Sequence, residues 1–242
     1  MKRYFDINFE PEKDAVLDAI EKRIKEGGVG YIAVCDGNVL SMALRDEEYR
    51  SEIDRAMFSI MDSSWIPLYV KMKYGDQCSQ YCGSDIFKDI TESGKYRQYF
   101  LGSSQNVLDG LKTNLSEIDR AIEGMKFKPL PFCDVKEFDY YQIASEINAD
   151  APEIIWLSLG APKQERFAAN LLPYLTRGVI IPVGAVFDFR SGVSTKRAPE
   201  WMLKCHMEFA YRIFKEPRKQ MKRCWRIIKT LPKIIKYNGH SI

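Results

Sequence analysis

Four short stretches of this chain place glycines and polar residues directly after an apolar run. Because ligands of open α/β sheets bind where the strands end, these residue types in this position favour a binding site. The stretches are residues 35–38 (CDGN), 102–106 (GSSQN), 160–165 (GAPKQE) and 184–192 (GAVFDFRSG), the last followed by KRAP at 196–199.

The first two stretches offer different ways to hold a substrate. Asp36 and Asn38 could orient a sugar, and the carboxylate could act as a base, but Asp-Gly-Asn is also ordinary turn chemistry. After Gly102, small residues before a helix would let backbone N–H groups approach a phosphate. The spacing there fits neither the dinucleotide fingerprint nor a P-loop.

The third stretch is more specific than a plain helix start requires. Gly160 allows a tight exit from the sheet, and Pro162 pre-sets the first turn of the following helix. Lys163 and Gln164, followed by Glu165, then stand at the positive end of that helix, suited to a phosphate or a sugar hydroxyl. We expect a ligand here; the plain alternative is a helix start with solvated polar residues.

The fourth stretch follows the last apolar run of the predicted sheet. It opens at Gly184 and carries Asp188, and Arg197 comes shortly after it. These two charged residues would either bind substrate or form a structural ion pair.

Neither a metal centre nor a nucleophilic triad is indicated. The two histidines, His206 and His240, lie far apart, and Cys78 and Cys82 have C-x3-C spacing with no partner pair. No Asp-x-Asp pair, the usual metal handle of nucleotide-sugar enzymes, occurs in the sequence. We therefore expect chemistry that needs no bound metal and no cofactor.

Composition predicts a folded cytosolic protein. The 242 residues are 45% hydrophobic and 12% aromatic, which excludes a disordered chain and allows one or two domains. No apolar run is long enough to span a membrane, and the start, MKRYFDINFEPEKD, lacks the apolar stretch of a signal peptide. Six cysteines are too sparse for a disulfide scaffold, so we expect reduced thiols.

Charge is divided unevenly along the chain. Residues 196–242 carry 13 Lys/Arg and 3 Asp/Glu, whereas residues 1–195 carry 23 basic and 30 acidic groups. A basic tail on an acidic body indicates an anionic partner, with a solvated helical surface as the plain alternative. The shift divides the chain into a core over 1–195 and a C-terminal appendage over 196–242.

The appendage has the pattern of a helix lying on an anionic bilayer. Pro217 can start a helix, and basic residues then line one face if the helix continues past Pro232. An adjacent apolar stripe could also pair chains away from the membrane. Nucleic acid is the rival partner, but no stacking platform or nucleic-acid motif supports it, and we expect none. The basic residues are Lys215, Lys219, Lys222, Arg226, Lys229 and Lys233, and the stripe is Met221, Trp225 and Ile228.

Apolar runs and helical periodicity alternate along the core. Because the runs are apolar throughout, they predict a Rossmann-like parallel sheet with helices on both faces. Strands are expected over 29–34, 99–102, 154–159 and 179–183, and helices over 15–25, 39–60 (with a second segment starting at Asp46-Glu47), 107–115 and 163–175.

Two longer segments resemble one enzyme family. Residues 154–167 and 179–223 combine GAPKQE, VGAVFDF-x-x-G, RAPEW and E-x-x-YR-x-x-x-EPR, and FLGSSQNVLDGL and GSDIF extend the match upstream. This set is similar to the WecG/TagA/CpsF glycosyltransferases (glycosyltransferase family 26). The resemblance implies transfer of a sugar, often of N-acetylmannosamine type, from a UDP-sugar to a polyprenyl-diphosphate-linked sugar. It also implies an inverting, metal-independent mechanism and a C-terminal segment docked on the membrane.

The resemblance also implies roles for individual residues. Gln164 would contact the donor or acceptor sugar, and Asn38 matches the asparagine of the family's T-x-N turn, with Asp36 at the threonine position. A G-x-D motif is matched by Gly83, Ser84 and Asp85, although Gln80 holds the place of the arginine that normally precedes it. Tail residues would reach the lipid diphosphate; they are Arg212, Arg218 and Arg223, with Lys222 and Arg226 beside them.

One departure from the family concerns the general base. The family usually carries P-D-G after its second strand, and in the segment 62–69 we place Leu68 at that aspartate. An apolar side chain takes no proton, so another carboxylate acts, the acceptor is deprotonated otherwise, or the chain is inactive. We expect Asp36 to be the base, with Asp62 second.

The sequence therefore predicts a glycosyltransferase of bacterial surface polysaccharide synthesis, peripheral on the inner face of the cytoplasmic membrane. The alternative, motivated by Leu68, is a catalytically inactive nucleotide-sugar-binding scaffold in the same pathway. UDP release with a lipid-linked acceptor separates the two. Donor sugar, acceptor sugar and linkage do not follow from the motifs.

Overall fold

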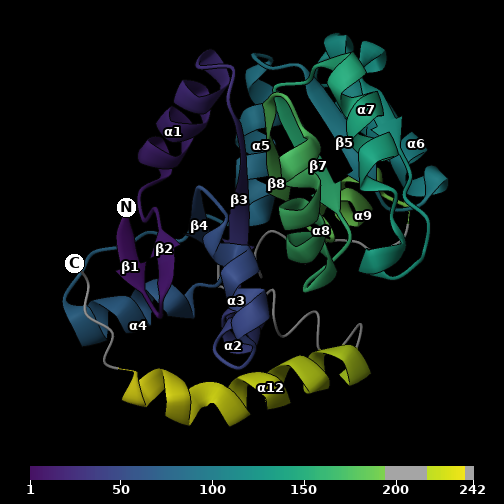
Figure 1. The fold of residues 1–242 in the computed structure, drawn as a ribbon. Coiled ribbons are helices and arrows are strands. Elements are labelled where there is room, and N and C mark those ends of the chain that lie inside the picture. Colours follow the sequence, from purple (N-terminus) through teal and green to yellow (C-terminus); the bar gives the residue numbers. More distant parts are fainter. Residues whose placement is uncertain (194–216, 238–242) are drawn as a thin grey trace.

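The computed structural model describes residues 1–193 and 217–237, and one eight-stranded sheet forms its centre (Figure 1). The strand order is β1-β2-β4-β3-β8-β7-β5-β6. β1 and β2 pair antiparallel and the other neighbours pair parallel, which confirms the expected parallel sheet. The strands are β1 (Lys2–Tyr4), β2 (Ile7–Phe9), β3 (Val29–Cys35), β4 (Phe58–Met61), β5 (Gln98–Gly102), β6 (Lys126–Lys128), β7 (Ile154–Ser158) and β8 (Gly178–Pro182).

Helices cover both faces of this sheet, as predicted. One core is closed by α1 (Lys13–Lys25), α5 (Gly83–Ser93), α6 (Gln105–Ser116) and α9 (Val186–Ser191). The other is closed by α2 (Gly37–Ala43), α3 (Glu47–Asp54), α4 (Trp65–Tyr74), α7 (Tyr140–Asp150), α8 (Lys163–Leu171) and α12 (Pro217–Lys236). Three short 3-10 helices lie at Arg120–Gly124, Val135–Glu137 and Leu172–Tyr174.

Alternate residues of each central strand enter the two cores. In β7, Ile155 and Leu157 join one core, while Ile154 and Trp156 join the other, and all four side chains are fully buried. Side chains alternate across a strand, so a strand with cover on both faces is apolar at every position. This explains the continuous apolar runs of the sequence.

The winding of the chain reverses beside β3. From β3 the chain winds outward to β4 and then crosses to β5, on the far side of β8 and β7. Ligands of open sheets bind at such a reversal, outside the carboxyl ends of the strands. The turns after β3, β5, β7 and β8 are the four stretches that the sequence singles out.

The helix expected over residues 39–60 is wrong as a single element. Two helices, α2 and α3, occupy its first part, and the fully buried strand β4 its end. The break at Asp46-Glu47 is confirmed, because the Asp46 carboxylate accepts from the backbone N–H of Tyr49 at 3.0 Å and caps α3. The strand was missed because its short run of residues, apolar except for Ser59, also fits a buried helical turn.

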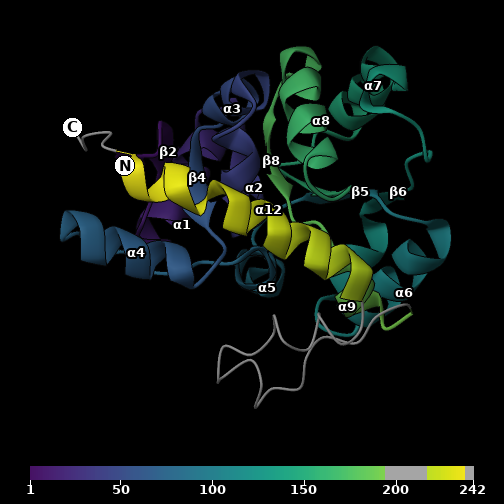
Figure 2. The same cartoon turned by 90° about the horizontal axis from the view of Figure 1, so that it is seen from below.

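The helix α12 crosses the sheet's carboxyl edge and continues through Pro232, as its basic face requires (Figures 1 and 2). It packs on α2, where the hydroxyls of Ser41 and Thr230 lie 2.6 Å apart and Ser41 also donates to the carbonyl of Arg226 at 3.1 Å. Thr230 and Ile234 are fully buried. The described part of the appendage therefore rests directly on the core.

Gly102 has a conformation that resists any side chain. Its φ is +103°, and a Cβ there would collide with the backbone carbonyl of Ser158. We expect Gly102→Ala to lower the unfolding free energy by about 2 kcal/mol, measured by urea denaturation. Gly124→Ala is the matched control, because nothing lies within 4 Å of a Cβ at Gly124. Equal denaturation midpoints for the two variants would contradict this account of Gly102.

Candidate active site

In the described part of the chain, the turns that carry the predicted site residues lie at one edge of the sheet, and hydrogen bonds join neighbouring turns. The N–H of Asp62, after β4, donates to the carbonyl of Cys35 at the end of β3 (3.0 Å). The N–H of Ser103, after β5, donates to the carbonyl of Ser158 (3.1 Å), and the Ser158 hydroxyl donates to the carbonyl of Gly184, after β8 (2.7 Å). Hydrogen bonds thus join the turns after β3 and β4 to each other, and likewise the turns after β5, β7 and β8.

Asp36 begins α2 and also contacts the tail helix. Its Oδ1 accepts from the N–H groups of Asn38 and Val39 at 2.9 and 2.7 Å, the geometry of a helix N-cap. Its Oδ2 accepts from Nη2 of Arg223 at 3.0 Å. The turn chemistry considered from sequence is therefore present, and both carboxylate oxygens are engaged.

Asn38 makes the second contact between core and tail. Its side chain is 4% exposed, and its Oδ1 accepts from Nη1 of Arg226 at 2.5 Å. Two of the predicted lipid-diphosphate residues, Arg223 and Arg226, are thus brought to the turn after β3. Arg218 and Lys222 lie exposed on α12, whereas Arg197 and Arg212 fall outside the described residues.

The position directly after β4 is held by Asp62. Its Oδ1 accepts from the N–H of Gly83, the first residue of α5, at 2.8 Å, and its carbonyl accepts from Nε2 of Gln80 at 2.7 Å. Leu68 instead lies within α4, with 59% of its surface exposed. The placement of Leu68 at the family's aspartate is corrected, since β4 ends at Met61 and an aspartate follows it at once.

The start of α5 lies against the ends of β3 and β8. A Cβ on Gly83 would lie 3.4 Å from Cγ1 of Val34 and 3.7 Å from Cα of Val183, so the helix approaches the sheet closely. Behind it, the Cys82 thiol lies 2.9 Å from Oδ2 of Asp85 and 3.2 Å from the hydroxyl of Ser84.

Burial is the main cause that raises the pKa of Cys82, to about 12. A raised pKa favours the protonated thiol, which is the unreactive form of cysteine.

A buried hydrogen-bond network fixes Gln164 at the start of α8. Its Oε1 accepts from the N–H of Gly160 at 3.1 Å, and its Nε2 donates to Oε1 of Glu165 at 2.8 Å. The hydroxyl of Tyr49, from α3, donates to the other oxygen of Glu165 at 2.9 Å. Burial raises the pKa of Glu165 to about 7, while the bonds from Gln164 and Tyr49 oppose the rise.

The side chain of Lys163 has different partners from that of Gln164. Its ammonium donates to the carbonyl of Cys133 and lies 4.9 Å from the ring centre of Phe138. Both partners belong to the segment between β6 and α7, so this structure commits the ammonium to that segment rather than to the sheet edge. Pro162 precedes it and is exposed.

The remaining predicted residue, Asp188, lies in α9. It is half-buried, and its carbonyl accepts from the hydroxyl of Ser191 at 2.9 Å. Because Arg197 is outside the described residues, the choice between a substrate contact and an ion pair stays a prediction.

Sequence reasoning missed three residues that shape the site. Tyr49 orients Glu165, and the Ser63 hydroxyl accepts from the N–H of Gly37 at 3.0 Å. A Cβ on Gly37 would lie 2.8 Å from Nε1 of Trp65, so the glycine permits this indole to pack on the turn. The glycine of Asp-Gly-Asn is the sequence feature that could have indicated a bulky neighbour such as Trp65. No sequence feature indicates the roles of Tyr49 and Ser63.

The described part of the chain contains no candidate metal centre. Within residues 1–193 and 217–237 there is no group of three His, Cys, Asp or Glu side chains that could hold a metal ion.

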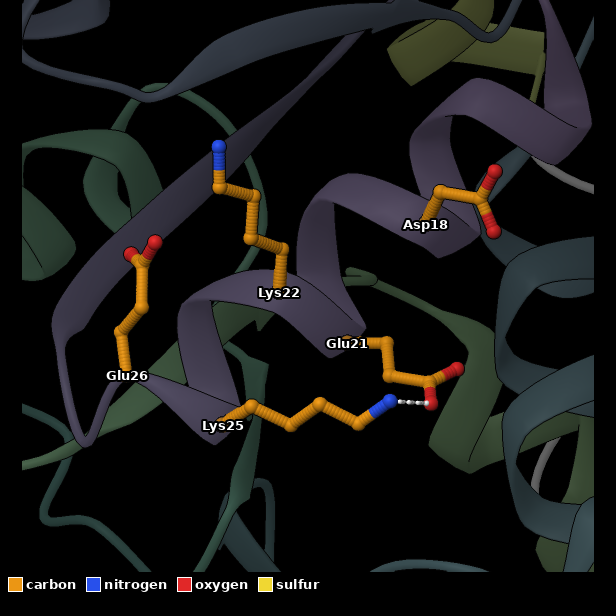
Figure 3. A pocket seen from close by; sticks show the side chains of 5 residues that line it. All are labelled: Asp18, Glu21, Lys22, Lys25 and Glu26. Carbon is orange, nitrogen blue, oxygen red and sulfur yellow. Dashed lines mark ion pairs between the residues drawn. The ribbon is translucent and has the colours of Figure 1, made fainter.

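A hollow of about 390 Å³ lies on α1, where Lys25 and Glu21 form an ion pair (Figure 3). Since α1 leads into the amino end of β3, this hollow lies away from the carboxyl edge. Its lining is Asp18, Glu21, Lys22, Lys25 and Glu26.

Fold and site together define a Rossmann-like α/β enzyme whose polar edge is crossed by a basic helix. The sequence profile of the glycosyl transferase WecG/TagA/CpsF family matches residues 3–240, and the chain belongs to this family of glycosyltransferases. The resemblance seen in the sequence is thereby confirmed.

Two relatives carry the same name, N-acetylglucosaminyldiphosphoundecaprenol N-acetyl-beta-D-mannosaminyltransferase. The protein of Bacillus subtilis (strain 168) is 25% identical over 221 residues, which cover 90% of this chain and 82% of the relative. The protein of Bacillus spizizenii is 24% identical over 208 residues, which cover 85% and 77%.

The raised pKa of Glu165 predicts a pH-dependent stability. An unfolded glutamate ionises near 4.5 and the folded one near 7, so the unfolding free energy falls as pH rises between these values, by roughly 3 kcal/mol. Glu165→Gln removes this titration. In urea denaturation, the unfolding free energy of the variant relative to that of the wild type should therefore rise from pH 5 to pH 8. The exposed Glu123→Gln is the control, and a constant difference for Glu165→Gln would refute the assignment.

Proposed function

We propose that this enzyme transfers N-acetylmannosamine from a UDP-sugar to a polyprenyl-diphosphate-linked N-acetylglucosamine, with inversion at the anomeric carbon. The relatives' names support this sugar and this acceptor. The observation that carries the proposal is the meeting of Arg223 and Arg226 with Asp36 and Asn38, because it puts cations for a lipid diphosphate beside the sheet edge. The product would enter bacterial surface polysaccharide.

The donor would bind along the ends of β5, β7 and β8. Helices α6, α8 and α9 begin there, and their free N–H groups suit the diphosphate of the nucleotide. Glycines at 102, 160 and 184 let the backbone come close, and the fixed amide of Gln164 would hold a sugar hydroxyl. The charge of the leaving UDP would then be stabilised by backbone dipoles and tail arginines, with no bound metal.

Asp62 is the better base of the two aspartates. Both oxygens of Asp36 accept hydrogen bonds, from the α2 N–H groups and from Arg223, which supports a positioning role for Asp36. The Asp62 carboxylate is engaged too, by the N–H of Gly83, but its place supports the assignment: it directly follows β4, and its own N–H donates to the carbonyl of Cys35 at the end of β3. It would take the proton of the acceptor hydroxyl as that oxygen attacks the anomeric carbon. The attack comes from the side opposite to UDP, and UDP leaves with the electron pair of the bond that breaks.

The acceptor would arrive from a membrane surface. No helix in the described residues is long and apolar enough to cross a bilayer. On α12, however, Trp225 is 60% and Met221 67% exposed, and the exposed Lys222 and Lys229 lie beside them. Each basic residue contributes about 1 kcal/mol near an anionic bilayer, so the helix would dock peripherally, on the cytoplasmic side.

We expect Asp62→Asn to lower turnover by about 10²–10⁴-fold, because the amide still accepts from Gly83 but takes no proton. The measurement is UDP release from UDP-N-acetylmannosamine with a polyprenyl-diphosphate N-acetylglucosamine acceptor in vesicles. Asp36→Asn should lose much less, since its oxygen still caps α2 and the partly exposed ion pair with Arg223 that it loses contributes little energy. Asp18→Asn, on the α1 hollow, is the control without effect.

The outcomes separate the proposals. A larger loss in Asp36→Asn than in Asp62→Asn would make Asp36 the base. UDP-sugar binding without UDP release in the wild type would support the scaffold alternative, for which Leu68 no longer provides a motive.

A further inference from the structure

Large exposed apolar side chains concentrate on two neighbouring helices. On α12 they form the stripe already described, extended at the C-terminal end. On α4, Leu68 is 59% and Met72 78% exposed. A cluster of this kind marks an interaction surface rather than isolated surface residues. The α12 residues are Met221, Trp225, Ile228, Leu231 and Ile235.

The exposed residues of α4 point away from the core. Ile66, Pro67 and Val70 are its buried residues. At about 100° per residue, Leu68 and Met72 are one turn apart and lie on the side opposite to that buried face. They form a two-residue apolar ridge that is exposed among the residues that the structure describes.

The α4 helix is fixed to the C-terminal end of α12. The hydroxyl of Tyr69 donates to the carbonyl of Ile234 at 2.9 Å, and Nζ of Lys73 donates to the carbonyl of Ile235 at 2.9 Å and to that of Tyr237. Seen from below, the two helices lie on the same side of the molecule (Figure 2). Tyr69 and Lys73 thus occupy the flank of α4 that faces α12, and the ridge lies next to that flank.

Basic side chains lie on the opposite flank of α12. Lys222, Lys229, Lys233 and Lys236 are exposed there. Toward α2 and α3 a hollow of about 440 Å³ is lined by Arg50, Lys233 and Lys236 together with Leu44, Pro232 and Tyr237. An apolar strip bordered by cations fits a bilayer with anionic headgroups, because chains insert under the strip while phosphates meet the lysines.

We infer that α4 and α12 together form the bilayer-docking face, and that Leu68 and Met72 enter the lipid interface beside the stripe of α12. This inference rests on the proposed membrane docking of α12 and adds a second insertion point to it. Two fixed lines of contact determine the orientation of a docked body, whereas one helix would let it roll about its axis. The carboxyl edge would then face the bilayer in a single orientation.

Methionine oxidation provides the test, because the two helices each expose one methionine. The rate of sulfoxide formation is followed by mass spectrometry, with vesicles of phosphatidylglycerol and phosphatidylcholine or of phosphatidylcholine alone. Anionic vesicles should slow oxidation several-fold at Met72 on α4 and at Met221 on α12. The half-buried Met125, beside β6, is the internal control and should not respond.

The outcomes distinguish this inference from the proposed function. Protection of Met221 without protection of Met72 overturns the inference and leaves docking by α12 standing. If neither methionine is protected, the proposed membrane docking of α12 is itself contradicted. Protection that exists without vesicles and disappears on dilution would show that a second copy of the chain covers the face, which also overturns the inference.

A pair of double variants provides an independent measurement. Leu68→Ser/Met72→Ser removes the α4 ridge and should lower partitioning onto anionic vesicles by about tenfold in flotation assays. Ile118→Ser/Tyr174→Ser, at two similarly exposed positions elsewhere, should leave partitioning unchanged. Thermal unfolding by circular dichroism verifies that both variants fold. Equal partitioning of the two would contradict the role of α4.

Discussion

The contact between Arg223 and Asp36, with that between Arg226 and Asn38, is the constraint on which the rest depends. The ion pair is partly exposed, 26% for the arginine side chain and 24% for the aspartate, so its own stabilising energy is small. Its importance is geometric, because it positions α12 across the end of β3. Buried Thr230 and Ile234 supply the packing that keeps the helix there. Arg223 and Arg226 of the tail therefore lie at the sheet edge, in contact with Asp36 and Asn38.

Three carboxylates at this edge have three different environments. Asp36 caps a helix and faces a guanidinium, Asp62 lies between a strand end and the start of α5, and Glu165 is fully buried beneath Gln164. Environment, rather than residue type, separates such groups into different roles. Glu165 is fully buried and hydrogen-bonds the side chain of Gln164, while Asp36 and Asp62 are partly exposed.

How much the sequence could predict depended on how local each signal was. GAPKQE predicts its own local structure because the strand end, the helix start and Gln164 follow one another within a few residues. Tyr49 could not be found in this way, since its partner Glu165 lies 116 residues further on. The β4 strand was hidden because a short apolar run fits both a strand and a helix.

The proposed general base shows the same limit. Leu68 was misplaced by matching motif letters across a segment whose strand end the sequence alone does not fix. The structure fixes that end at Met61, which puts Asp62 in the expected position. The meeting of Arg223 with Asp36 needed the fold, because no pattern links two residues 187 positions apart.

The position of α12 has one more consequence. If the helix lies flat on lipid, the reacting edge stands about one helix diameter, ~10 Å, above the surface. The helix would then act as a spacer. A sugar joined to its lipid through a diphosphate extends away from the bilayer, whereas a short headgroup would stay below the edge. Acceptors would be sorted by height before any hydroxyl is recognised.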